Sequence, residues 1–248
     1  MTAAPLALVT AGTSAIGRHF VAALQKGGYR VAYTYLPGEP APADTATTRA
    51  FASDAADEAQ VAAFHAQAAA WAGTAPSVMV CNAGVQTWST LVDLKVEDWD
   101  RVMATNLRGL FLNTQAAARA MIAAGIPGSI ITLGSGCNKH AFPRLVDYTT
   151  SKGGVEQFTK VAAVELGPHG IRVNCIAPGA IETERTKAEA PDYAATWSPV
   201  TPLRRIGRPE DLTGPLMFLI SDAASFVTGQ TLWVDGGAFT QSNWPYPT

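Results

Sequence analysis

The sequence predicts an α/β fold of one domain, in which helices cover both faces of a doubly wound parallel sheet and so give three layers. Short apolar runs alternate with longer helical patterns, and this alternation is typical of strand–helix–strand units. The 248 residues are 48% apolar, enough to bury one large core without metal or disulfide bridges. No repeat and no internal linker divides the chain, so we expect a single domain over residues 1–248.

Four apolar strands and two helices are expected in the first third of the chain. Gly27-Gly28 ends the first helix, as a left-handed cap does. Prolines between the second and third strands predict a loop. In chain order, the expected elements are strand 6–10, helix 15–26, strand 29–35, strand 49–53, helix 55–71 and strand 77–81.

Two long helices and two more strands follow: helix 97–124, strand 128–133, helix 147–166 and strand 171–177. Residues 178–209 contain several prolines and no clear strand. We therefore expect a long functional loop with a short helix, forming a substrate lid near 180–208. The tail 236–248 carries Trp244 and Tyr246 between prolines, and aromatic side chains in such a tail predict a docking role.

The charge balance excludes several classes of protein. A net charge of −2 and an isoelectric point near 6.1 give no basic footprint for nucleic acid. No apolar run reaches the ~18 residues of a membrane span, and the N-terminus lacks the basic region of a signal peptide. Only 15% of the residues are charged, which favours an oligomer that hides part of its surface.

The cysteines and histidines predict neither disulfides nor a metal site. Cys81, Cys137 and Cys175 form no CxxC pair and are odd in number, so we expect reduced thiols and a cytoplasmic protein. The four histidines are scattered without ligand spacing, and we expect no bound metal.

The first strand leads into a turn of small residues that runs from Thr10 to Gly17, with Gly12 between them. Such a turn brings backbone N–H groups and a helix N-terminus towards a ligand, and the helix dipole favours a pyrophosphate there. A plain strand-to-helix turn is the alternative on this signal alone.

This turn resembles the Thr-Gly-x3-Gly-x-Gly element of the short-chain dehydrogenase/reductase family, except that Ala11 and Ala15 stand where that family usually has glycine. The resemblance extends from residue 6 to residue 237. It is carried in order by Asn82-Ala83-Gly84, Asn106-Leu107-Arg108-Gly109, Pro178-Gly179, 205–211 and 228–237. It implies a Rossmann-type fold and a nicotinamide cofactor, with no metal.

The resemblance also implies which residues hold the cofactor: Thr10, Gly12, Thr13, Ser14, Ile16, Gly17, Tyr35, Asp54, Ala55, Asn82, Ala83, Gly84, Tyr148, Lys152, Pro178, Gly179, Ile181 and Thr183. At the end of the second strand, Tyr35 and Leu36 offer no carboxylate for the ribose hydroxyls of NAD. We therefore favour NADP(H), with NAD(H) as the alternative and with Thr13, Ser14 and Arg18 as groups available to a phosphate. For Asp54, the cap of the following helix is an equal interpretation.

Tyr148 and Lys152 are four residues apart, which places both side chains on one face of the predicted helix. A cation close to a phenol lowers its pKa from the ordinary value near ~10. A solvated helix face is the alternative interpretation of this pair. The resemblance makes Tyr148 the acid/base, Lys152 its partner and ribose ligand, Ser135 the residue that polarises the substrate oxygen, and Asn106 the support of a proton relay.

These residues together predict an NAD(P)-dependent oxidoreductase that interconverts a ketone and a secondary alcohol by hydride transfer. A sugar or polyol 1-dehydrogenase and a 3-oxoacyl reductase are narrower alternatives. A halohydrin dehalogenase-like lyase, against which Lys152 argues, and a non-catalytic scaffold are alternatives of another class. A small carbonyl or alcohol substrate is expected to contact Gly136, Cys137, His140, Phe142, Tyr193 and Trp197.

The resemblance further implies a homotetramer, assembled through the two long helices and the last helix–strand unit. The Ala-rich stretches in 106–124 and 155–166 suit close helix packing. We expect the Trp244-Pro245-Tyr246 tail to pack at a subunit interface.

Overall fold

The computed structural model describes residues 4–241 and contains one sheet of seven parallel strands. The strands are arranged in the order β3-β2-β1-β4-β5-β6-β7. Their bounds are β1 Leu6–Val9, β2 Arg30–Tyr35, β3 Thr48–Ala52, β4 Pro76–Cys81, β5 Gly128–Leu133, β6 Ile171–Pro178 and β7 Thr231–Val234. The predicted doubly wound parallel sheet is confirmed.

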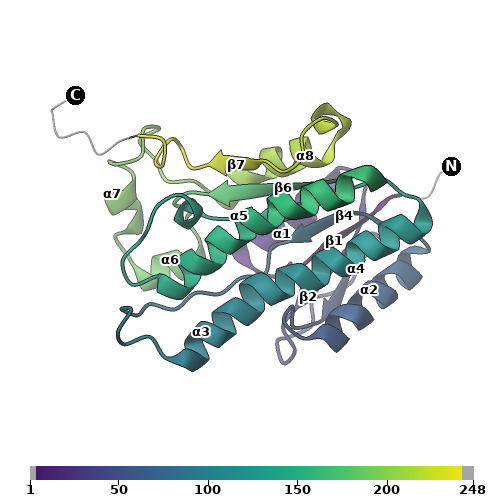
Figure 1. Ribbon diagram of the computed structural model, residues 1–248, viewed down its shortest axis with the longest axis horizontal. Helices are drawn as coiled ribbons and strands as arrows, with labels where there is room; N and C mark the ends of the chain where they lie inside the picture. Colours follow the sequence, from purple (N-terminus) through teal and green to yellow (C-terminus); the bar gives the residue numbers. More distant parts are fainter. Residues whose placement is uncertain (1–3, 242–248) are drawn as a thin grey trace.

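Helices cover both faces of the sheet and complete three layers (Figure 1). One face packs against α1 (Ala15–Lys26) and α8 (Thr213–Ile220). The other packs against α2 (Glu58–Ala72), α4 (Gly109–Ala124) and α5 (Val146–Leu166). Each face has its own apolar core, and every residue of β1 is buried, as expected for a central strand covered on both sides.

The direction of the strand order reverses at β1, which pairs with β2 on one side and β4 on the other. Connections on the two sides of such a point run away from each other, so the carboxyl ends of the strands border a crevice. The first turn follows β1, and Asn82-Ala83-Gly84 follows β4. The fold therefore brings two of the predicted cofactor elements to one edge of the sheet.

Several predicted elements differ from the observed ones. The expected helix 97–124 is α3 (Val96–Met103) and α4 joined by a π-helical turn, η1 (Ala104–Arg108). The helix expected to begin at residue 55 begins at Glu58, and its N-cap is Asp57 rather than Asp54. Left-handed backbone at the end of α1 occurs at Gly28, with φ of 87°.

The segment 178–209 carries two short helices, α6 (Glu184–Glu189) and α7 (Tyr193–Trp197), where one was expected. The ranges of α8 and β7 were not assigned from the sequence. Trp244 and Tyr246, for which docking is predicted, lie outside the described residues.

Cys81, Cys137 and Cys175 are free and buried. Between residues 4 and 241, no helix has both the length and the apolarity that crossing a membrane requires. The same residues contain no cluster of three or more His, Cys, Asp or Glu side chains suited to a metal ion.

Candidate active site

The first turn is held in place by the end of β4. The Thr10 hydroxyl accepts hydrogen bonds from the backbone N–H groups of Asn82 and Ala83, each at 2.9 Å. The Asn82 amide donates in return to the carbonyl oxygens of Thr10 and Ala11, at 3.1 and 3.0 Å, and to Ser14 Oγ at 3.1 Å. Asn82 therefore fixes the shape of the turn through these hydrogen bonds.

Two glycines allow the turn to pack closely. A Cβ on Gly12 would lie 2.6 Å from the Tyr33 side chain, and a Cβ on Gly17 would lie 2.1 Å from the Ala11 carbonyl oxygen. Side chains at either position would push the start of α1 away from the sheet. This close approach is the physical reason for glycine at both positions.

The donor set of the turn fits a pyrophosphate. Ser14 caps α1 by accepting from Gly17 N at 3.1 Å. The backbone N–H groups of Thr13, Ala15 and Ile16 form no hydrogen bond with any part of residues 4–241. Free N–H groups at the N-terminal end of a twelve-residue helix, where the dipole is positive, are suited to an anionic group.

At the expected adenosine end, Tyr35 ends β2 half-buried and Leu36 follows it largely exposed. Asp54 and Ala55 lie after β3. Asp54 accepts from Ala56 N at 2.9 Å in a local turn, so its carboxylate does not cap α2. No acidic side chain stands at the end of β2, as the sequence analysis anticipated.

Asn106 lies in η1, where the wider π-helical turn interrupts the long helix. Such turns are frequent at functional sites. Its buried amide accepts from Val85 N at 2.8 Å and donates to Val85 O and to Ser151 Oγ, both at 2.9 Å. Asn106 thus joins Val85, after β4, to Ser151 of α5, and Ser151 directly precedes Lys152.

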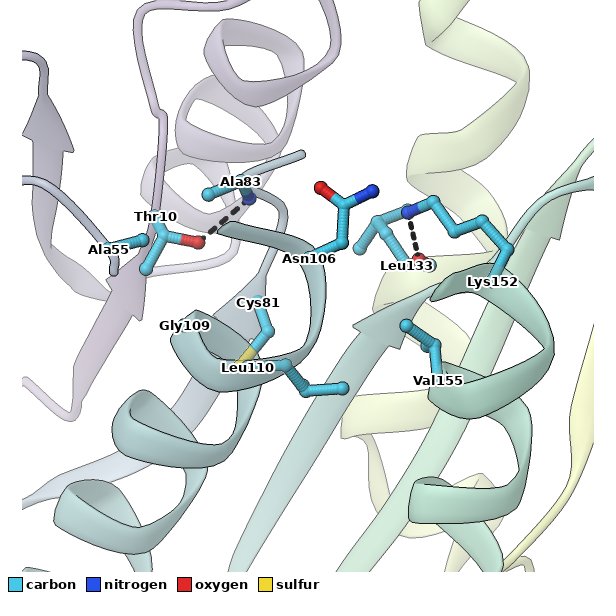
Figure 2. Close-up of a pocket in the computed structure, with 10 residues that line it drawn as sticks. All are labelled: Thr10, Ala55, Cys81, Ala83, Asn106, Gly109, Leu110, Leu133, Lys152 and Val155. Carbon is cyan, nitrogen blue, oxygen red and sulfur yellow. Dashed lines mark hydrogen bonds between the residues drawn. The ribbon is translucent and has the colours of Figure 1, made fainter. Parts of the chain in front are cut away.

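Lys152 is buried, and its ammonium donates to the Leu133 carbonyl at 2.7 Å. Burial lowers the pKa of Lys152 to about 8. A cavity of about 10 Å³, enough for about one water molecule, is lined by Lys152, Asn106 and Thr10 among others (Figure 2). The expected proton relay between Asn106 and Lys152 therefore has room for its water.

Tyr148 is on α5 and lies one helical turn before Lys152, whose nitrogen is 5.4 Å from the phenol ring centroid. Burial raises the pKa of Tyr148 to about 12, while the Ser135 hydroxyl and the Arg185 charge oppose this rise. The net shift is opposite to the lowered Tyr148 pKa that was predicted, because burial outweighs the nearby charges. At neutral pH, the Tyr148 phenol keeps its proton and can donate it.

Ser135 follows β5 and caps the short helix η2 (Gly136–Asn138). Its backbone N–H donates to Asn138 Oδ1 at 3.0 Å, and its hydroxyl accepts from Cys137 N at 3.3 Å. Asn138 was not singled out as a positioning residue. The Ser-x-x-Asn spacing that makes this capping pair was the available signal.

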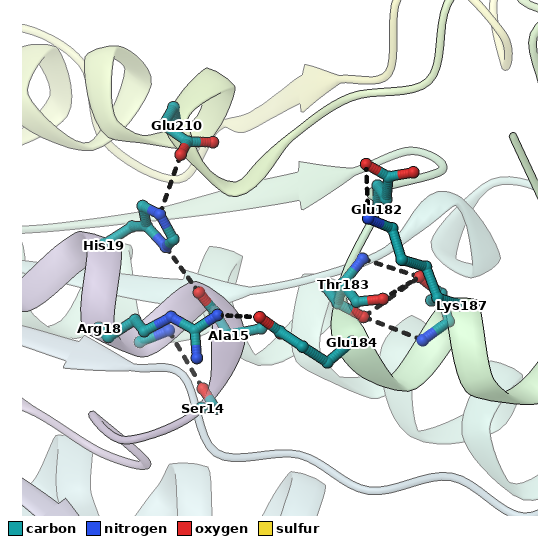
Figure 3. A network of polar contacts seen from close by, with 11 residues as sticks. Ser14, Ala15, Arg18, His19, Glu182, Thr183, Glu184, Lys187 and Glu210 are labelled. Atoms are coloured by element: carbon teal, nitrogen blue, oxygen red, sulfur yellow. Dashed lines mark hydrogen bonds and ion pairs between the residues drawn. The ribbon is translucent and has the colours of Figure 1, made fainter.

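The 180–208 segment is joined by an ion pair to α1, the helix that the first turn leads into (Figure 3). Arg18 of α1, suggested from the sequence as a group available to a phosphate, is ion-paired with Glu184 of α6. His19 lies 3.0 Å from Glu210 and 2.7 Å from the Ala15 carbonyl oxygen. Thr183 caps α6 by accepting from Thr186 N at 3.1 Å.

Pro178, Gly179 and Ile181 lead from β6 into this segment. Gly179 N donates to Val234 O at 3.0 Å, and a Cβ on Gly179 would lie 2.7 Å from the Asp235 Cα. Ile181 is buried and bridges to Gly207, which ties the start of the segment to its end.

Arg185 of α6 is a further group at the site. Its charge acts on Tyr148 and on Tyr193. When the Gln86 amide is turned so that its oxygen faces these donors, that oxygen accepts from Arg185 at 3.3 Å and from Trp88 Nε1 at 3.0 Å. No local sequence signal marks Arg185 as a site residue, because nothing in its neighbourhood shows that α6 faces the phenol.

The predicted substrate residues fall into two groups. Gly136 and Cys137 lie directly beside Ser135 in η2. Phe142, Tyr193 and Trp197 pack with one another, and His140 packs on Phe239, a residue that the sequence analysis did not identify. All the predicted catalytic and substrate residues therefore lie around one end of the sheet.

Comparison with known proteins identifies the family. A family model described as enoyl-(acyl carrier protein) reductase matches residues 10–239. The (3R)-3-hydroxyacyl-CoA dehydrogenase of Mus musculus is 38% identical over 251 residues, covering 94% of this chain and 96% of the relative. The chain belongs to the short-chain dehydrogenase/reductase family.

Two other members are similarly close. The L-rhamnose 1-dehydrogenase (NAD(P)(+)) of Sphingomonas sp. (strain SKA58) is 36% identical, covering 94% of this chain and 95% of the relative. The crystal structure of a gluconate 5-dehydrogenase from Burkholderia cenocepacia J2315, in complex with NADP and tartrate, has a TM-score of 0.87 at 31% identity and covers 96% of both chains.

Ala11 has a left-handed backbone with φ of 49°, at a position where short-chain dehydrogenase/reductase members usually have glycine. The turn thus keeps the glycine conformation with an alanine in it, at some cost in strain. Ala15 opens α1 as its first residue and has no such strain.

Proposed function

We propose that this member of the family is an NAD(P)-dependent oxidoreductase that interconverts a ketone and a secondary alcohol, with Tyr148 as proton donor and acceptor. The observation that carries the proposal is the placement of Ser135, Tyr148 and Lys152 at the carboxyl end of β5, beside a turn whose free N–H groups suit a pyrophosphate.

The nicotinamide cofactor supplies or accepts the hydride when it is bound. In reduction, Ser135 holds the carbonyl oxygen and Tyr148 gives it the phenolic proton as the carbon is reduced, which yields the alcohol and a Tyr148 phenolate. The Lys152 ammonium stabilises this phenolate, and a proton returns through Lys152 and the water-sized cavity beside Asn106. The reverse sequence oxidises the alcohol.

The remaining predicted cofactor residues have places in this proposal. Thr10, Asn82 and Ala83 hold the turn. Thr13, Ser14 and Ile16 would hold the pyrophosphate of a bound cofactor, and Gly84 lies beside Lys152 and Asn106. Thr183 caps the helix that carries Glu184. The segment 180–208 then acts as a lid, tied to the turn by the Arg18–Glu184 pair.

We favour NADP(H) over NAD(H) because Tyr35 and Leu36 give no carboxylate to bind the 2′ and 3′ ribose hydroxyls. The proposal is tested by titrating NADPH and NADH into the purified protein and following cofactor fluorescence. Tighter binding of NADPH is the expected result. Tighter binding of NADH overturns the preference, and binding of neither cofactor overturns the oxidoreductase assignment itself.

Two narrower alternatives remain attached to specific relatives. A 3-oxoacyl reductase corresponds to the hydroxyacyl-CoA dehydrogenase relative, and a sugar 1-dehydrogenase corresponds to the rhamnose relative. A substrate panel that includes a 3-oxoacyl thioester and L-rhamnose distinguishes them from a simple ketone reductase.

We also propose a homotetramer that works in the cytoplasm. Supporting apolar surface lies on the two long helices, where Phe111 of α4 is 44% exposed and Val164 of α5 is 78% exposed. The edge strand β7 is only half-buried. Free buried thiols suit a reducing compartment. Light scattering should give four times the 26.0 kDa chain mass, and a monomer mass overturns the proposal.

A further inference from the structure

A buried phenylalanine packs directly against the turn beside Ser135. Phe239 follows β7, and its ring occupies the space that a side chain at position 136 would take. A Cβ on Gly136 would lie 2.1 Å from Cε2 and 2.3 Å from Cζ of that ring. Only glycine at position 136 permits this contact, because any side chain there would overlap the Phe239 ring.

Phe239 is the centre of a group of aromatic rings. Its ring meets Phe142 edge-on, with centroids 5.8 Å apart and planes at 89°, and meets Trp197 at 6.4 Å and 73°. Trp197 also contacts Phe142 at 6.1 Å and Tyr193 at 6.2 Å. Edge-to-face contacts of this kind are favourable and fix ring orientation. We call Phe142, Tyr193, Trp197 and Phe239 the aromatic wall.

The members of the aromatic wall differ in exposure in a way that matters for ligand binding. Phe239 is 8% exposed, whereas Phe142, Tyr193 and Trp197 are half-buried and keep open ring surface. Here Phe239 forms the buried support, Phe142 and Trp197 pack directly on its ring, and Tyr193 packs on Trp197.

The open side of the aromatic wall borders the reacting groups. Gly136, the neighbour of Ser135, packs against the Phe239 ring, and Phe142 and Trp197 pack on that ring in turn. The Tyr193 phenol adds to the rise in the Tyr148 pKa, in keeping with this placement. A substrate whose oxygen lies between Ser135 and Tyr148 therefore has its substituent next to the open rings.

We infer that the aromatic wall receives a flat apolar substituent, an aryl group attached to the carbonyl carbon, and that Phe239 is the positioning residue that orients the other three rings. This inference rests on the proposed function and names its substrate class. Aromatic rings bury apolar ligand surface well and stack on other rings. They offer few partners to the hydroxyl groups of a sugar, which would be desolvated without compensation.

The test compares kcat/KM for two ketones of different substituent, acetophenone and 2-butanone, at saturating cofactor. The wild type should favour acetophenone by about tenfold or more, in the range that an apolar pocket contributes. Phe239→Leu and Trp197→Leu should each reduce this preference several-fold, mainly through the KM for acetophenone. Phe226→Leu is the matched control, since Phe226 is fully exposed, and it should leave the preference unchanged.

Three results overturn the inference while leaving the proposed function intact: turnover of 2-butanone without an aryl preference, faster turnover of L-rhamnose than of acetophenone, or an equal loss on both ketones in Phe239→Leu. If the wild type reduces no ketone, the proposed function fails and a binding measurement decides the inference. Acetophenone should then quench tryptophan fluorescence in the wild type and not in Trp197→Leu. Equal quenching in both proteins, or none in either, overturns it.

Discussion

Arg18 near the start of α1 is ion-paired with Glu184 at the start of α6, which joins the first turn to the 180–208 segment (Figure 3). The two residues are 166 positions apart in the chain. Both side chains are substantially exposed, 49% and 73%, so the pair adds little to the stability of the fold. Its expected effect is on how closely the segment covers the turn.

Removing this ion pair should weaken cofactor binding without lowering the melting temperature. Glu184→Gln should raise the cofactor KM about two- to fivefold, within the range of exposed ion pairs. Added salt should raise the wild-type KM towards that of the variant, because exposed charges are screened. Glu165→Gln, a similar change at an exposed site on α5, is the control. An unchanged KM in Glu184→Gln would refute the role.

Replacing Ala11 by glycine should stabilise the protein. Ala11 has φ of 49°, a conformation that glycine adopts without strain, so Ala11→Gly should raise the free energy of unfolding by about 1 kcal/mol. Ala15→Gly is the matched control, because Ala15 is helical and glycine should destabilise it there. Urea denaturation measures both. A loss of stability in Ala11→Gly contradicts the strain.

The rates of ketone reduction and of alcohol oxidation should depend differently on pH. Reduction starts from the protonated phenol of Tyr148, whose raised pKa near 12 keeps it protonated, so this rate should be flat around neutral pH. Oxidation starts from the phenolate and should rise with pH.

Arg185→Gln removes a charge that lowers the pKa of Tyr148, and it should move the oxidation profile to higher pH. Arg49→Gln removes a charge of β3 that is paired with Asp44, and it should not move the profile. Identical profiles for wild type and Arg185→Gln would exclude this effect.

His65 should make the fold sensitive to acid. It is buried with Nε2 facing Asn113 Oδ1 at 3.3 Å, and burial lowers its pKa to about 4 from 6.5. On acidification, His65 is protonated in the unfolded chain before it is protonated in the folded one. The free energy of unfolding should therefore be unaffected by His65 above about pH 6.5 and fall by about 3 kcal/mol as the pH approaches 4. His65→Gln should flatten this slope in urea denaturation, while the exposed His169→Gln should not. An unaltered slope in His65→Gln argues against the assignment.

Much of the fold was predictable because buried strands and helix caps are local signals. The strand at 128–133 and the helix at 15–26 match β5 and α1 residue for residue. The π-helical turn at Asn106 was not predictable, since no residue in 104–108 breaks a helical pattern. Asp57 rather than Asp54 capped α2 because Asp54 is used in a local turn.

The site residues also divide into those that a sequence signal marks and those that only the fold reveals. Ser135, Tyr148 and Lys152 were identified by the family resemblance, to which the four-residue spacing of Tyr148 and Lys152 adds a local signal. Phe239 and Arg185 could not be identified in this way, since each acts across the fold. Phe239 meets Gly136 from 103 positions away, and only the space left by that glycine shows the contact. The pKa of Tyr148 also departed from expectation, because burial cannot be read from the Tyr-Lys spacing.

The role of Tyr148 as proton donor is tested by measuring the rate of NADPH oxidation with a ketone panel, for wild type and for Tyr148→Phe, with cofactor binding measured in parallel. The wild type should consume NADPH with at least one ketone. Tyr148→Phe should bind NADPH equally well and lose about a hundredfold or more of the rate, as expected when a proton donor is removed. Equal rates in the two proteins, or no turnover by the wild type with either nicotinamide cofactor, would contradict the account.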